Sequence, residues 1–79
     1  MTQINVEQAV KEILAKQLSI DINTIHMDSR LAEDLNVDSF GAVELAFALE
    51  ERFNLKLSDD AVYTSKLVKD IVDYIASKL

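Results

Sequence analysis

The stretch DSFGAVELAFALEERF, residues 38–53, decides the fold, because its apolar residues recur with the period of an α-helix. At about 100° per residue, one set falls on a single broad arc of the kind that faces a protein core: Ala42, Leu45, Ala46, Leu49 and Phe53. Asp–Ser pairs are ordinary helix starts, since their side chains can accept a hydrogen bond from a free backbone N–H. We therefore predict a helix that begins at Asp38, runs to about Phe53 and ends at Asn54.

The opposite side of the same helix is also apolar. A second set of side chains falls together there: Phe40, Val43 and Phe47. Three carboxylates flank this set: Glu44, Glu50 and Glu51. A helix in so small a protein cannot easily bury two opposite faces, and glutamates are hard to bury. The second set is either core, if the helix is central, or a docking surface whose carboxylates steer basic partners, which is the interpretation we favour.

The chain before this helix predicts one helix and one long loop. A first helix is expected from an N-cap at Asn5 to Leu18, with Gln8 placed three residues after the cap as in a capping box. Residues 19–37 lack a sustained helical period, although apolar residues are scattered through them. They predict a long loop that apolar side chains pin down, with a short turn at LAEDL.

The chain after the central helix predicts two further helical segments. SDDAVY, residues 58–63, predicts a short turn or helix capped by Ser58 or Asp59. The last helix is expected from about Ser65 to the C-terminus, with these side chains facing inward: Leu67, Val68, Ile71, Val72 and Ile75. No segment shows the alternation of a strand. The predicted fold is all-α: a small antiparallel four-helix bundle, with three main helices, one short helix and a long first loop, forming a single domain over residues 1–79.

Composition and charge exclude several classes of protein. The net charge of −6 argues against nucleic-acid binding, which needs a basic stripe, and residues 33–60 hold the excess with eight acidic and two basic residues. No apolar run approaches the ~18 residues of a membrane span, and the start lacks the layout of a secretory signal. We therefore expect a cytoplasmic monomer that does not insert into membranes. With no cysteine, the chain has no thiol of its own.

Two catalytic or metal-binding interpretations fail on spacing. Asp34, Asn36 and Asp38 match the opening of an EF-hand loop. Its sixth position, however, holds Ser39 instead of glycine, and its twelfth holds Leu45 instead of glutamate. For a hydrolase, the single histidine, His26, lies in the long loop, and Ser39 lacks the G-x-S-x-G pattern. We predict no metal site and no catalytic residue.

Ser39 has two remaining interpretations. It is either an ordinary helix-starting residue or a site of covalent modification, because a hydroxyl at a helix start lies beside unpaired amide donors that suit a phosphate. The local sequence alone favours the first.

The wider sequence favours the second, because LAEDLNVDSFGAVELAFALEERF, residues 31–53, resembles the signature of the acyl carrier proteins. The resemblance extends to the amphipathic first helix, the long loop, the short acidic segment SDDA and the closing IVDYI. It implies a non-enzymatic carrier whose Ser39 receives 4′-phosphopantetheine from coenzyme A through a separate phosphopantetheinyl transferase. The arm would supply the missing thiol, and acyl groups would be held on it as thioesters.

The resemblance also implies roles for the residues around Ser39. Asp38 would flank the modification site and help the transferase arrange its metal and the coenzyme. Glu44, Glu50 and Glu51 would pair with basic patches on acyl-transferring, condensing and reducing enzymes of fatty-acid or related polyketide and specialised lipid biosynthesis. The apolar contact would come from the second set on the central helix: Phe40, Val43 and Phe47.

Three positions depart from the common pattern of fatty-acid carriers. Phe40 stands where leucine is usual, Gly41 where a polar residue is usual, and Ser58 where proline often begins the third helix. An Asp-Ser-apolar-Gly start also resembles D-alanyl or aminoacyl carrier proteins, which leaves the cargo open. Two alternatives from other classes are a small acidic helical interaction or cation-binding module without a prosthetic group, and a minimal hydrolase.

Overall fold

Capping residues set the ends of the first two long helices in the computed structural model, which describes residues 5–57 and 61–79. The Asn5 side chain accepts a hydrogen bond from the Gln8 N–H at 3.0 Å and begins α1 (Val6–Leu18). Asp38 caps α2 (Ser39–Phe53), and Asn54 ends it in the left-handed conformation that closes many helices. Both predicted helices are confirmed, with caps at Asn5, Asp38 and Asn54. The predicted capping box at α1 is not formed, because the Gln8 side chain donates to Glu12 at 3.3 Å.

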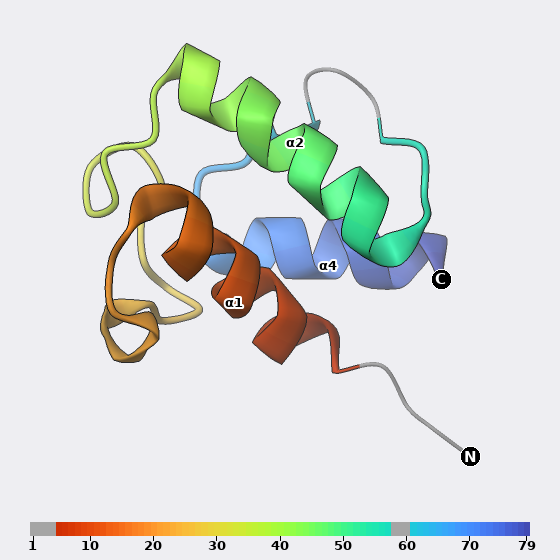
Figure 1. Cartoon of the computed structure of the whole chain (residues 1–79), viewed down its shortest axis with the longest axis horizontal. Coiled ribbons are helices and arrows are strands. Elements are labelled where there is room, and N and C mark those ends of the chain that lie inside the picture. Colours follow the sequence, from red (N-terminus) through yellow and green to blue (C-terminus); the bar gives the residue numbers. More distant parts are fainter. Residues whose placement is uncertain (1–4, 58–60) are drawn as a thin grey trace.

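The remaining elements are also helical. The 3₁₀ helix η1 (Ile22–Thr24) follows α1, and α3 (Ala61–Thr64) and α4 (Val68–Lys78) follow α2. Among the described residues there is no strand, only one isolated bridge between Arg30 and Leu67. In Figure 1, α1 runs in the opposite direction to α2 and α4. The predicted all-α class is confirmed.

The core lies where these helices meet. α1 packs against α2 and α4, and α3 packs against α2 and α4. The most deeply buried side chains come from α1, α2 and α4: Val10, Leu14, Leu45, Leu49, Val68 and Ile75. All the residues on the predicted core-facing arc of α2 are buried, so its assignment is confirmed.

The long loop between α1 and α2 is held against the start of α4. The N–H groups of Val68 and Lys69 donate to the carbonyl oxygens of Ser29 and Met27, at 3.0 and 2.9 Å. In return the Leu31 N–H donates to the Lys66 carbonyl at 2.9 Å. Buried Ile25 and Leu31 anchor the loop in the core, as the sequence predicts. The loop thereby fixes the chain that leads into α2.

The start of α4 differs from the prediction. The helix begins at Val68 instead of about Ser65, and Leu67 is only half-buried. The reason is that one Asp70 carboxylate oxygen accepts from the N–H groups of both Lys66 and Leu67, at 3.1 and 3.0 Å. The helix therefore begins three residues later than predicted. The predicted caps of the short helix, Ser58 and Asp59, lie outside the described residues. α3 overlaps the stretch predicted for it, residues 58–63, and extends one residue beyond it.

Asp70 gives the fold a pH dependence that can be measured. The N–H groups of Leu67 and then Lys66 hold the pKa of Asp70 below its ordinary value, with smaller help from nearby lysine charges. A lowered pKa in the folded state means that this carboxylate stabilises the fold above the ordinary aspartate pKa of about 3.9. That stabilisation is lost as the pH falls through the lowered pKa.

We therefore expect Asp70→Asn to lower the free energy of unfolding at pH 7 and to have a much smaller effect at pH 3, measured by urea unfolding. Asp73→Asn is the matched control, because Asp73 is exposed on the same helix and makes no described hydrogen bond. An Asp70→Asn effect that is the same at both pH values would contradict this account.

Candidate functional site

At the start of α2, one residue caps the helix and the next presents an exposed hydroxyl. The Asp38 carboxylate accepts from the Gly41 N–H at 2.7 Å, and the Asp38 carbonyl accepts from the Ala42 N–H at 2.8 Å. Asp38 is therefore the residue that starts α2, and Ser39 is its first helical residue. Ser39 does lie at the start of the helix, as predicted, but its hydroxyl is not the cap, because the Asp38 carboxylate caps α2.

The Ser39 side chain is exposed, and none of the described hydrogen bonds involves its hydroxyl. The backbone N–H groups of Ser39 and Phe40 likewise have no acceptor among the described residues. Free amide donors at the start of a four-turn helix favour a negatively charged group bound nearby. An exposed hydroxyl beside such donors fits a phosphodiester-linked group such as 4′-phosphopantetheine.

Gly41 has a local explanation that the sequence does not reveal. A Cβ at this position would lie 3.2 Å from the Asp38 carboxylate oxygen that accepts the Gly41 N–H, and 3.7 Å from a Val37 methyl carbon. The first distance is tight, so a larger residue would require the cap to shift by a few tenths of an ångström. Glycine here costs helix propensity of up to about 1 kcal/mol but leaves the cap undisturbed.

A surface hollow opens beside Ser39. It has a volume of about 300 Å³. The loop before α2, the first turn of α2 and the α3 region line it: Leu31, Ala32, Val37, Asp38, Ser39, Ala42, Val62 and Ser65. A group attached to Ser39 therefore has a partly apolar wall directly beside its point of attachment.

The second apolar set on α2 is exposed, as the sequence favours. Phe40 is 71% exposed, Val43 46% and Phe47 64%. We call these three residues the apolar strip. The alternative that they belong to the core is wrong, because they are exposed while α1 and α3 pack against α2, whose buried residues lie on the opposite arc. Three large apolar side chains therefore form an exposed apolar surface on one face of α2, near Ser39.

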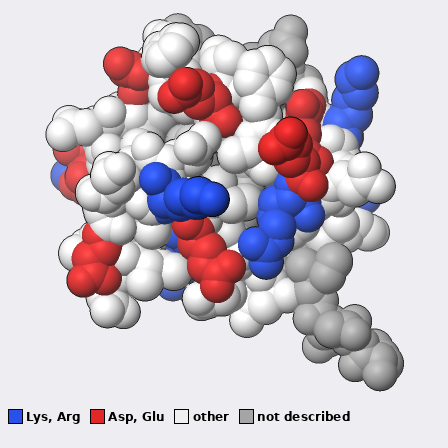
Figure 2. Space-filling model, in the orientation of Figure 1, with Lys and Arg blue, Asp and Glu red and all other residues white. Residues whose placement is uncertain are grey.

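The three glutamates around the apolar strip are not equivalent. Glu44 and Glu51 are exposed, whereas Glu50 is half-buried and its carboxylate accepts from the Leu57 N–H at 2.8 Å. Glu50 thus ties the chain after α2 back to the helix, which the sequence did not predict. Figure 2 shows carboxylates along the upper part of this face, where α2 lies in Figure 1, with basic side chains across the middle.

Arg52 does not neutralise these carboxylates, although it follows Glu51 directly. Its guanidinium group reaches Glu12 on α1, at 3.5 Å. Neither Glu44 nor Glu51 has an ion pair among the described residues. Within the described chain, no basic side chain neutralises their charges.

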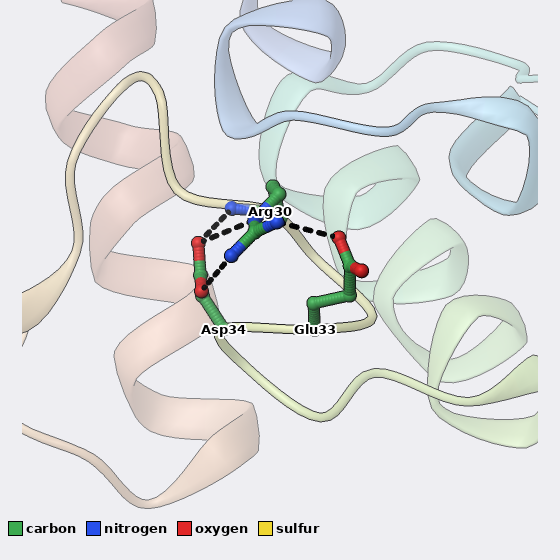
Figure 3. A network of polar contacts seen from close by, with 3 residues as sticks. All are labelled: Arg30, Glu33 and Asp34. Carbon is green, nitrogen blue, oxygen red and sulfur yellow. Dashed lines mark hydrogen bonds and ion pairs between the residues drawn. The ribbon is translucent and has the colours of Figure 1, made fainter.

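The acidic stretch before α2 is partly neutralised by one arginine. Arg30 contacts Glu33 at 3.0 Å and Asp34 at 3.3 Å (Figure 3). The pKa of Asp34 is lowered mainly because its carboxylate accepts a hydrogen bond from the backbone N–H of Arg30, at 2.8 Å. The Arg30 guanidinium group lowers this pKa further. Asp34 is therefore engaged in a turn, and no group of acidic or histidine side chains in the described chain gathers closely enough to hold a metal ion.

His26 lies apart from Ser39. It lines a different hollow, shared with Gln8, Lys11 and η1, and none of the residues of that hollow lines the one beside Ser39. The structure therefore does not bring together the serine and histidine that a hydrolase of this chain would need. In the part of the chain that the structure describes, no helix is long and apolar enough to cross a membrane.

Comparison with known proteins gives consistent similarities. Residues 8–75 match the protein family described as "Phosphopantetheine attachment site". The chain is 46% identical to an acyl carrier protein of Helicobacter hepaticus over 86% of its length and 90% of the relative. It is 40% identical to an acyl carrier protein of Thermosynechococcus vestitus over 100% of its length and 98% of the relative.

The fold has a match among solved structures. The NMR structure of an "HMG-ACPI domain from CurA module" of Lyngbya majuscula superposes with a TM-score of 0.83 at 27% identity. The match covers 100% of this chain and 85% of the other.

Proposed function

The chain belongs to the acyl carrier protein family, and on this premise we propose that Ser39 is the residue that carries 4′-phosphopantetheine. Members of this family are carriers instead of enzymes, and the group is the one after which the matched family is described. The observation that carries the proposal is the exposed Ser39 hydroxyl at the start of α2, beside backbone N–H groups without described acceptors. When bound, the arm supplies a thiol that can hold acyl groups as thioesters.

The chain's own residues prepare this site in distinct ways. Asp38 holds the first turn of α2 in place, so that the Ser39 side chain is presented outward from a rigid element. The N–H groups of Ser39 and Phe40, which have no described acceptor, would lie near the charge of a phosphate attached to Ser39. Only one oxygen of the Asp38 carboxylate takes part in the capping bond. We also propose that this carboxylate helps a phosphopantetheinyl transferase position its metal and coenzyme A.

A loading experiment followed by digestion tests the proposal directly. The apo protein is incubated with coenzyme A, Mg²⁺ and a broad-specificity phosphopantetheinyl transferase, then cut with trypsin. The peptide of residues 31–52 contains Ser39 and no other serine, threonine or tyrosine. A gain of one phosphopantetheine mass on this peptide supports the proposal. Absence of the gain, or its appearance on another peptide, overturns it.

We propose that the apolar strip, with Glu44 and Glu51, docks the enzymes that act on the carried group. Large apolar side chains give contact area, and carboxylates around them favour partners with basic patches. These partners would be acyl-transferring, condensing and reducing enzymes of fatty-acid or related lipid biosynthesis. Glu50 stays in the proposed surface, although its bond to the Leu57 N–H makes its main contribution structural.

Glu44→Lys tests this docking surface. We expect kcat/KM of the transferase for the apo protein to fall about tenfold or more, because a positive charge would face the partner's basic patch and like charges at an interface cost several kcal/mol. Asp73→Lys makes the same change of charge on α4, where Asp73 is exposed, and should leave the rate within about twofold by the same reasoning. Equal losses in the two variants would show that only net charge matters.

We expect a cytoplasmic monomer formed by one domain over residues 1–79, which cell fractionation, light scattering and a single unfolding transition would test. The cargo is proposed to be a fatty acyl or related acyl group, because the relatives are named acyl carrier proteins. Mass spectrometry of the carrier purified from its native cells would distinguish an acyl cargo from D-alanine or another amino acid.

A further inference from the structure

A hollow of about 410 Å³ lies where α1 packs against α2. Three residues of each helix line it: Ile13, Lys16, Gln17, Ala48, Glu51 and Arg52. None of them lines the hollow beside Ser39. Glu51 belongs both to this hollow and to the carboxylates beside the apolar strip, so the hollow adjoins the proposed docking surface.

Two contacts between the helices fix Lys16 beside this surface. The Gln17 side-chain amide donates to the Glu44 carbonyl at 3.4 Å, and Arg52 pairs with Glu12 at 3.5 Å. On α1 these contacts lie on either side of Lys16 in the sequence. The backbone at Lys16 therefore keeps its place relative to α2.

The charge of Lys16 has no carboxylate partner within the described chain. Arg52 pairs with Glu12, and Lys11 pairs with Glu7 at 2.9 Å, whereas the exposed Lys16 takes part in none of the described ion pairs or side-chain hydrogen bonds. Its place in the last turn of α1 suits a positive charge, because the helix dipole is negative there. That interaction leaves the hydrogen-bond donors of the ammonium group free for another molecule.

The docking surface therefore changes sign at its α1 edge. Figure 2 shows basic side chains next to acidic ones on the face where α1 and α2 are neighbours in Figure 1. A partner with a uniformly basic face would set positive charge against Lys16 as well as against Glu44 and Glu51, and like charges at an interface are unfavourable. A partner with a carboxylate beside its basic patch would be attracted at both points, so the pattern discriminates between partners.

We propose that Lys16 is a specificity-determining residue, which binds a carboxylate of the phosphopantetheinyl transferase at the α1 edge of the surface that this enzyme covers. The inference rests on the proposed docking at the apolar strip, and the transferase is the partner that attachment at Ser39 requires. It adds one cation to a surface of acidic and apolar groups. It also requires the transferase to carry an aspartate or glutamate next to its basic patch.

Reversing the charge of Lys16 tests the proposal by the sign of the effect. Simple attraction between an acidic carrier and a basic enzyme predicts that Lys16→Glu raises kcat/KM of the transferase from the same organism for the apo protein. We expect instead a fall of about fivefold, and a smaller fall in Lys16→Gln, both reduced at high salt because exposed charges are then screened.

Lys69→Glu is the matched control, because it makes the same change of net charge at an exposed position of α4. It should not lower kcat/KM. A rise or no change in Lys16→Glu would overturn the proposal, and so would equal falls in the two variants.

Cross-linking of the wild-type carrier to the same transferase tests the contact itself. A carbodiimide joins an amine directly to a carboxylate that touches it. The tryptic peptide of residues 12–30 contains Lys16 as its only lysine. We expect to find this peptide joined through Lys16 to an aspartate or glutamate of the transferase. The same reaction should join Glu44 or Glu51 to lysines of the transferase if the docking surface is correct.

The two proposals fail in different ways. If Glu44→Lys does not lower kcat/KM and neither Glu44 nor Glu51 is linked, the docking surface itself is wrong. If Glu44 or Glu51 is linked but Lys16 is not, only the role of Lys16 is wrong. Should urea unfolding show that Lys16→Glu does not fold, the cross-links of the wild-type protein decide.

Discussion

Replacing Ser39 by alanine is expected to abolish the addition of phosphopantetheine and to leave the free energy of unfolding within about 0.5 kcal/mol of the wild-type value. The two effects separate because the Ser39 hydroxyl takes part in none of the described hydrogen bonds, while Asp38 makes the capping bond to the Gly41 N–H. The variant loses only the attachment point. A serine that merely started the helix would give the opposite pattern, with lost stability and unchanged loading.

Mass spectrometry after incubation with coenzyme A and transferase measures the first effect, and urea unfolding measures the second. Ser77→Ala is a matched control, because Ser77 is another exposed helical serine, near the end of α4. It should load like the wild type. Full loading of Ser39→Ala would refute attachment at Ser39, and a large loss of its stability would refute the view that Asp38 alone caps the helix.

The features of α2 could be predicted because they depend on residues close together in the chain. The buried arc and the apolar strip both follow from a spacing of three and four residues, and the caps at Asp38 and Asn54 are local. The long loop was predictable for a related reason, since its scattered apolar residues could not form a helical stripe. Such local patterns predict the folded structure because a helix places residues close in sequence at fixed positions on its surface.

The features that the sequence did not reveal depend on contacts between distant segments. α4 begins at Val68 because Asp70 caps the preceding N–H groups and the long loop pairs with Lys66. Residues 31 and 66 are far apart in sequence, so no local pattern marks their pairing. Glu50 is a similar case, because its bond to the Leu57 N–H requires the chain after α2 to turn back. Its spacing on the helix suggested only a surface charge.

These tertiary contacts change how the acidic charge is distributed. Residues 33–60 hold the excess of acidic residues, but Arg30 pairs with Glu33 and Asp34, and the Glu50 carboxylate accepts from a backbone N–H. The charges left without described partners on α2 are those of Glu44 and Glu51, beside the apolar strip. The acidic charge of α2 without a described partner therefore lies beside the apolar strip, and Gly41 preserves the cap at the start of the same helix.

The division of α2 into a buried and an exposed face makes a second strong prediction, for two residues that lie two positions apart. Leu49 is 1% exposed, so Leu49→Ala removes packed methyl groups and leaves a cavity in the core. We expect it to lower the free energy of unfolding by about 2–5 kcal/mol, a large part of the stability of a small domain. Phe47→Ala removes a larger side chain from the same helix.

Phe47→Ala should nevertheless change the free energy of unfolding by less than about 0.5 kcal/mol, because its side chain is mainly in water already. Urea unfolding followed by circular dichroism measures both variants under the same conditions. Phe47→Ala, which removes more atoms, is therefore expected to lower the free energy of unfolding less than Leu49→Ala. The hydrophobicity of the two side chains alone would predict the reverse. Comparable losses in the two variants would mean that Phe47 packs into the core, and the apolar strip would then be unavailable to partners.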